Sequence, residues 1–160
     1  MSIVDLETVL AIAEEKGCAI PSFNVYNMET VMGVARAAEE TNSVVIFQVY
    51  SRLFDNAEAT YLAPIILQAI NRMKGKAAFH LDHGVKDKEI LRALRLGVTG
   101  VMYDGSTLPL AENIAETKRI VSLCQEVGIG VEGELGHVGT TKEGSGIRHH
   151  RIEDGTRGNL

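Results

Sequence analysis

Short apolar segments rich in β-forming residues alternate with amphipathic helical segments along most of the chain, and this alternation constrains the fold more than any other feature. The segment 43–50 (SVVIFQVY) is almost continuously apolar, which is typical of a strand buried on both faces in a parallel sheet. Further strands are predicted at 19–26, 76–83, 100–104 and 130–136, and helices at 5–16, 28–41, 57–73, 86–94 and 110–127. Five strands alternating with helices favour a parallel α/β sheet, wound by right-handed crossovers into an open sheet or a barrel.

Composition narrows the class of protein. The length of 160 residues fits one domain, and 45% hydrophobic with 23% charged residues is the balance of a soluble chain that forms a core. A net charge of −5 argues against nucleic acid and anionic lipid as partners, and no apolar run approaches the ~20 residues of a membrane helix. The first ten residues lack a basic region, so no signal peptide is expected. Cys18 and Cys124 fit reduced thiols in the cytoplasm.

Polar and ionisable residues fall at the carboxyl ends of the predicted strands. They are Asn24, Gln48, His80, Asp82, His83, Asp104, Ser106, Glu132, Glu134 and His137. In parallel α/β folds the loops at this edge converge on one crevice, where ligands bind. The clustering therefore predicts an enzyme.

Each of the three motifs at this edge also has a purely structural explanation. In FHLDHG (79–84) a histidine beside a carboxylate suits metal and acid/base chemistry, but Asp82 could instead cap the next helix. In VMYDGS (101–106) Asp104 could simply stabilise a turn. In VEGELG (131–136) two glutamates on one strand face could lie on a solvated edge. Taken together, acidic groups crowded at one crevice repel one another unless a cation or proton neutralises them, which favours a divalent metal.

The motifs SFNVYN, FHLDHG, VMYDGS and VEGELG, in this order and spacing, resemble the class II (zinc-dependent) ketose-bisphosphate aldolases, and most of all their fructose- and tagatose-bisphosphate branch. The resemblance covers residues 1–146. It implies a (β/α)8 TIM barrel, here truncated to about five βα units in a partial barrel domain at 1–146. The segment 147–160 matches nothing in the family and is expected to be a loose C-terminal tail.

The resemblance also implies a reaction and its residues. The family cleaves a ketose 1,6-bisphosphate to dihydroxyacetone phosphate and glyceraldehyde 3-phosphate, with Zn²⁺ as a Lewis acid, in cytoplasmic glycolysis and carbohydrate metabolism. Its full-length members are homo-oligomers. The matching positions are Asp82 and Glu143 as catalytic groups, Asn24 and Ser51 as substrate contacts, His83 as the first zinc ligand, and Asp104 and Glu134 as carboxylates for an alternate or second metal position.

Departures from the family leave two alternatives open. The predicted mobile loop reads GTTKEG (139–144), and a complete barrel takes roughly 250 residues, so we expect impaired activity. Two further zinc histidines of the family have no counterpart in this sequence. The chain could instead be a different zinc-dependent α/β enzyme that completes its site with Glu134 and His137, or a non-catalytic fragment that pairs with a second chain.

Overall fold

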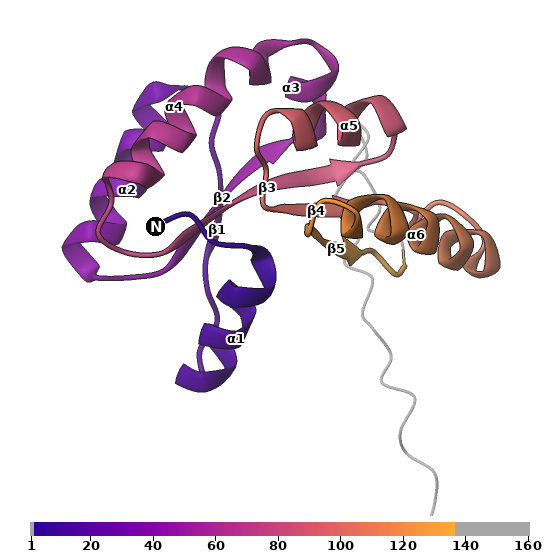
Figure 1. The fold of residues 1–160 in the computed structure, drawn as a ribbon, viewed down its shortest axis with the longest axis horizontal. Helices are drawn as coiled ribbons and strands as arrows, with labels where there is room; N and C mark the ends of the chain where they lie inside the picture. Colours follow the sequence, from indigo (N-terminus) through magenta and orange to yellow (C-terminus); the bar gives the residue numbers. More distant parts are fainter. Residues whose placement is uncertain (1, 137–160) are drawn as a thin grey trace, which may run out of the picture.

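All five predicted strands lie in a single parallel sheet (Figure 1). The structure is a computed structural model that describes residues 2–136. In chain order its elements are α1 (Leu6–Lys16), β1 (Ser22–Asn24), α2 (Met28–Thr41), β2 (Val45–Tyr50), α3 (Ser51–Asp55), α4 (Glu58–Arg72), β3 (Ala77–Gly84), α5 (Asp87–Arg95), β4 (Gly100–Tyr103), α6 (Leu110–Gln125) and β5 (Gly130–Gly133).

The strands follow one another across the sheet in the order β1-β2-β3-β4-β5. A doubly wound open sheet reverses its strand order at a switch point, whereas this sheet runs in one direction throughout. Right-handed crossovers that all step the same way place their helices on one face of the sheet. In Figure 1 the helices α2 to α6 accordingly form an arc on the outside of the strands. The fold is therefore the barrel alternative, a partial TIM-type barrel that has five strands within residues 2–136, of which β1 to β4 are each followed by a helix.

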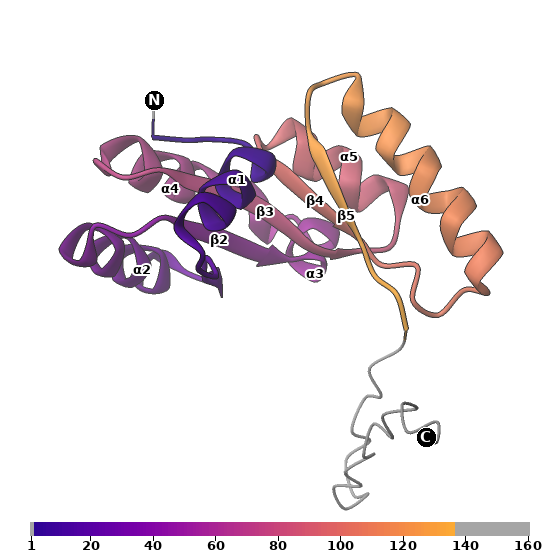
Figure 2. The same ribbon diagram turned by 90° about the horizontal axis from the view of Figure 1, so that it is seen from below.

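The main core lies between the sheet and this outer arc of helices. Alternate residues of β2 and β3, including Phe47, Phe79 and Leu81, point outward and are fully buried against the helices. The residues between them face the inside, where Ile46 and Ala78 pack against Leu6 and Val9 of α1. Figures 1 and 2 show α1 alone on this inner side. Burial on both faces explains why β2 reads as a continuous apolar run.

Local signals fix the helix ends that the sequence indicated. Asn27 caps α2 by accepting a hydrogen bond from the Thr30 amide, and the Thr30 hydroxyl oxygen accepts one from the Asn27 amide in return. Gly17 ends α1 with a φ of 60°, a left-handed conformation that glycine adopts at little cost.

The structure differs from the predicted elements in three places. A short helix, α3, follows β2 directly, and it carries Ser51. The first and last strands are shorter than predicted, so Glu134 lies just beyond the end of β5. The apolar pattern of 110–127 predicts an inward face with Leu110, Ile114, Ile120, Val121 and Leu123. Helix α6 is rotated from that face, because Asn113, Ile120 and Cys124 are buried while Leu110 and Ile114 are exposed. Among residues 2–136, no helix is long and apolar enough to cross a membrane.

Candidate active site

An irregularity in β3 brings Asp82 and His83 to the same side of the sheet. In a regular strand, successive side chains point to opposite faces, so His83 would point into the outer core. Instead, His83 has a φ of 51°, and the pairing of β3 with β4 shifts register between Leu81 and Gly84. Such bulges re-aim side chains, and a left-handed conformation at a residue other than glycine typically costs of order 1–3 kcal/mol. The surrounding structure thus holds His83 in a strained position beside Asp82.

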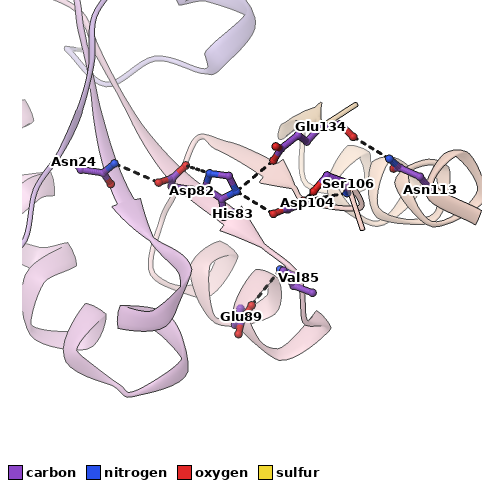
Figure 3. A network of polar contacts seen from close by, with 9 residues as sticks. All are labelled: Asn24, Asp82, His83, Val85, Glu89, Asp104, Ser106, Asn113 and Glu134. Carbon is purple, nitrogen blue, oxygen red and sulfur yellow. Dashed lines mark hydrogen bonds and ion pairs between the residues drawn. The ribbon is translucent and has the colours of Figure 1, made fainter. Parts of the chain in front are cut away.

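Three side chains from neighbouring strand ends meet at this point (Figure 3). His83 comes from β3, Asp104 follows β4, and Glu134 follows β5. One ligand atom from each residue lies within 4.8 Å of the others, so the three could hold a metal ion. The predicted convergence of these three groups is therefore present in the geometry, while their roles as metal ligands remain predictions.

Hydrogen bonding within this cluster is incomplete. Nδ1 of His83 lies 3.0 Å from Oδ2 of Asp104 and 3.3 Å from Oε2 of Glu134. A single ring nitrogen carries at most one proton and cannot serve both carboxylates well. The Oε2 atom of Glu134 is buried and accepts no hydrogen bond within residues 2–136. A bound cation would satisfy this oxygen, and a histidine with two carboxylates is a donor set that zinc accepts, so the residues fit the metal that the resemblance implies.

The charges of the cluster shift the pKa values of its members in a consistent direction. Partial burial alone lowers the pKa of His83, but the hydrogen bond with Asp104 and the charges of Asp82, Asp104 and Glu134 outweigh it and raise that pKa. Burial raises the pKa of Asp104, but hydrogen bonds from Ser106 and His83 outweigh it and lower the pKa. Without a cation, these shifts favour the protonated form of the His83 imidazole and the ionised form of the Asp104 carboxyl.

Asp82 lies beside the cluster but makes different contacts. Asp82 is only 5% exposed, and its Oδ2 accepts a hydrogen bond of 3.3 Å from Nδ2 of Asn24 on β1. Its other oxygen, Oδ1, lies 3.7 Å from Nε2 of His83. A buried carboxylate held from one side and adjacent to a candidate metal site is well placed to transfer a proton.

Two supporting residues hold the loops that carry the cluster. The amide and the hydroxyl of Ser106 donate to Oδ1 of Asp104, at 3.0 and 2.6 Å. Glu89 of α5 is buried and accepts hydrogen bonds from the amides of Val85 and Lys86, two and three residues after His83. Glu89 is not among the predicted site residues, although its place three residues after Lys86 at a helix start is the spacing of a capping box.

Two predicted site residues do not join these contacts. Ser51 begins α3 and is only 8% exposed, and within residues 2–136 no hydrogen bond or ion pair links its side chain to the cluster. Glu143 lies outside the described residues, as do His137 and the predicted tail at 147–160. The roles assigned to Ser51 and Glu143 remain predictions.

A second polar pair lies deeper on the inner face of the sheet. His80 of β3 is 3% exposed, and neither of its ring nitrogens has a hydrogen-bond partner in the described residues. Its Nε2 lies 3.6 Å from Oε2 of Glu132, and both residues line a cavity of about 440 Å³ under α1. Burial lowers the pKa of His80 to about 4, despite the opposing charge of Asp82. His80 is therefore neutral near pH 7, and its pKa is shifted in the opposite direction to that of its neighbour His83.

Comparison with known proteins identifies the same architecture. Residues 4–156 match the family described as fructose-bisphosphate aldolase class-II. Among solved structures, the YdjI aldolase of Escherichia coli K12 superimposes with a TM-score of 0.79 at 33% identity, over 84% of this chain and 51% of that one. A putative fructose-1,6-bisphosphate aldolase of Coccidioides immitis gives a TM-score of 0.75 at 28% identity, over 80% of this chain and 45% of that one.

A more distant similarity supports the fold alone. The fructose-bisphosphate aldolase of Campylobacter jejuni gives a TM-score of 0.75 at 22% identity, over 84% of this chain and 47% of that one. The present chain thus spans about half the length of the solved structures it matches. The family match also extends into the segment 147–160, so the domain boundary at 146 remains a prediction.

Proposed function

This chain belongs to the class II fructose-bisphosphate aldolase family, and from that premise we propose that it is part of a zinc-dependent aldolase. The proposed reaction cleaves a ketose 1,6-bisphosphate, fructose or tagatose, to dihydroxyacetone phosphate and glyceraldehyde 3-phosphate. The observation that carries the proposal is the gathering of His83, Asp104 and Glu134 within 4.8 Å of one another, next to the buried carboxylate of Asp82.

His83, Asp104 and Glu134 are the residues proposed to hold zinc, which when bound supplies a Lewis acid for the ketone oxygen of the substrate. Support for a cation here comes from Oε2 of Glu134, which accepts no hydrogen bond from residues 2–136, and from the three carboxylates that lie around the imidazole of His83. The identity of the metal as zinc rests on the family.

Asp82 is proposed as the general base for the bond cleavage. Its carboxylate takes the proton of the C4 hydroxyl as the bond between C3 and C4 breaks, which releases the aldehyde half. The hydrogen bond from Asn24 occupies Oδ2 and fixes the orientation of the carboxylate, so Oδ1 remains available on the side of His83. Asn24 is also exposed at the end of β1, which supports its proposed contact with substrate.

The second half of the reaction needs a proton donor. The dihydroxyacetone phosphate half takes up a proton at C3, and we propose Glu143 for this step on the basis of the family resemblance. Ser51 is proposed as a substrate contact on the same basis. Because Ser51 is buried in the first turn of α3, this contact would require that turn to move.

Partners and cellular location follow the family in this proposal. We infer a sugar bisphosphate as the substrate and a homo-oligomer for the full-length protein. The two free cysteines support a reducing compartment such as the cytoplasm.

Metal binding and cleavage test the proposal separately. The chain, and the same chain extended through its natural downstream sequence, should be titrated with zinc and assayed for cleavage of both bisphosphates. We expect His83→Ala to abolish stoichiometric zinc binding and His80→Gln to preserve it. We expect Asp82→Asn in the extended chain to keep zinc but to lose about 10²- to 10⁴-fold in cleavage rate. Cleavage that survives complete removal of metal would contradict the proposal.

A further inference from the structure

Asn113 of α6 contacts the segment that carries Glu134 (Figure 3). It is only 5% exposed, and its Nδ2 donates a hydrogen bond of 2.8 Å to the backbone carbonyl oxygen of Glu134. Its Oδ1 accepts one of 3.0 Å from the hydroxyl of Thr117, one turn later in the helix. Because Oδ1 is occupied by a donor, the amide is oriented with its Nδ2 toward Glu134.

The same side chain also packs against the segment that carries Asp104. Gly105 follows Asp104 directly, and a Cβ atom added to Gly105 would lie 2.8 Å from Cγ of Asn113 and closer still to its Oδ1. Real Cβ atoms do not approach neighbours so closely, so the backbone of Gly105 rests directly on the Asn113 amide. Asn113 therefore touches both chain segments that bring a carboxylate to the cluster.

The sheet itself does not hold Glu134. The pairing of β4 with β5 ends at Tyr103 and Gly133, one residue earlier. Beyond that point, the hydrogen bond from Asn113 replaces the sheet hydrogen bonds that would otherwise fix the backbone. Metal ligands must be placed to within a few tenths of an ångström. Because Asn113 fixes the segments of both Asp104 and Glu134, it affects how tightly these two carboxylates bind a cation.

We propose that Asn113 is a positioning residue that sets the separation of the Asp104 and Glu134 carboxylates and thereby the affinity of the cluster for a divalent cation. This inference rests on the proposed metal site, and it assigns a function to a helix residue that is not one of the proposed metal ligands. Residues that support metal ligands in this way typically contribute 10- to 100-fold in affinity.

The test uses Co²⁺ and Zn²⁺ alone as probes, with affinity measured by competition against a chelator and thermal unfolding measured without metal. We expect Asn113→Ala to weaken binding of both ions about 10- to 100-fold. Thr117→Val removes only the hydroxyl that orients the amide, so it retains the fold and weakens binding to a smaller extent. Ser122→Ala removes a hydroxyl that bonds the Lys118 carbonyl on the same helix and leaves affinity unchanged.

A double substitution tests the contact with Gly105. Gly105→Ala alone forces Asn113 away and weakens binding, whereas its effect is much smaller in the Asn113→Ala background, where the obstructing amide is absent. The inference is overturned if Asn113→Ala and Thr117→Val both lower the unfolding temperature but leave the affinities unchanged. If the unsubstituted chain binds neither ion, the proposed metal site is contradicted together with this inference. That result can be told from failure of the inference alone, because the metal titration of the unsubstituted chain then shows no binding.

Discussion

Nδ1 of His83 lies 3.0 Å from Oδ2 of Asp104, although 21 residues separate them in the sequence. The contact exists because the bulge in β3 turns His83 to the inner side of the sheet, toward the residue that follows β4. It joins two neighbouring strand ends and leaves the carboxylate of Glu134, the third member of the cluster, without that hydrogen bond. This arrangement has measurable consequences for ionisation, stability and activity.

Asp104→Asn should lower the pKa of His83, because it removes the charge and the hydrogen bond that oppose the effect of burial. The raised pKa of His83 contributes stability that is fully present below its ordinary value of 6.5 and is lost as the pH rises through the folded value. An NMR titration of the His83 ring without metal measures the shift. Asp5→Asn, which alters a helix cap on α1, is the control that should leave this pKa in place. An unchanged value in Asp104→Asn would show that the contact is absent in solution.

His80 should make the protein sensitive to acid. Its pKa is lowered to about 4, so between pH 6.5 and about 4 the unfolded state binds more protons than the folded state and stability falls as the pH falls. A shift of this size corresponds to about 3 kcal/mol. Urea unfolding at pH 7 and near pH 4 measures the loss, and His80→Gln should remove most of it. If His80→Gln loses as much stability in acid as the unsubstituted chain, the buried histidine is not the cause.

Gly84→Ala should disturb the bulge that positions His83. An added Cβ would lie 2.8 Å from Cδ2 of Leu81 and 3.1 Å from the carbonyl oxygen of Met102, and the backbone atom has little freedom to yield. We expect a loss of about 1–3 kcal/mol in unfolding free energy, together with weaker zinc binding. Gly33→Ala is the matched control, because nothing lies within 4 Å of its added Cβ in α2 and alanine favours a helix. It should stabilise the protein by roughly 0.5–1 kcal/mol.

Asn24→Ala should reduce both activity and stability. The residue is exposed, but its amide donates to the buried carboxylate of Asp82, so we expect a loss of about 1–3 kcal/mol in unfolding free energy. The lost hydrogen bond to the Asp82 carboxylate is of a kind worth about 1.5–3 kcal/mol, which corresponds to roughly 10- to 100-fold in cleavage rate. The assay requires the chain extended to full length. Asn71→Ala, on the exposed side of α4, controls for loss of a surface amide. Equal rates in the two variants would remove Asn24 from the proposed mechanism.

Much of the fold could be predicted because each element carries its own local signal. The continuous apolar run of β2 indicated a strand buried on both faces, and Asn27 and Gly17 marked helix ends that the structure contains. The rotation of α6 could not be predicted in this way. Leu110 and Ile114 look like inward residues, yet the polar Asn113 takes the buried position because it bonds the Glu134 carbonyl, a partner 21 residues away.

Local patterns in the sequence are enough to predict the order of strands and helices and the placement of Asp82, His83, Asp104 and Glu134 at equivalent strand ends. They are enough because apolar periodicity and capping depend on near neighbours in the chain. Which of these groups meet depends instead on how the strands pack. The left-handed backbone conformation of His83 directs its ring to the inner side of the sheet instead of the outer side. Asn24 can reach Asp82 only when β1 and β3 both lie beside β2. Such contacts depend on packing between distant segments, which no local pattern encodes.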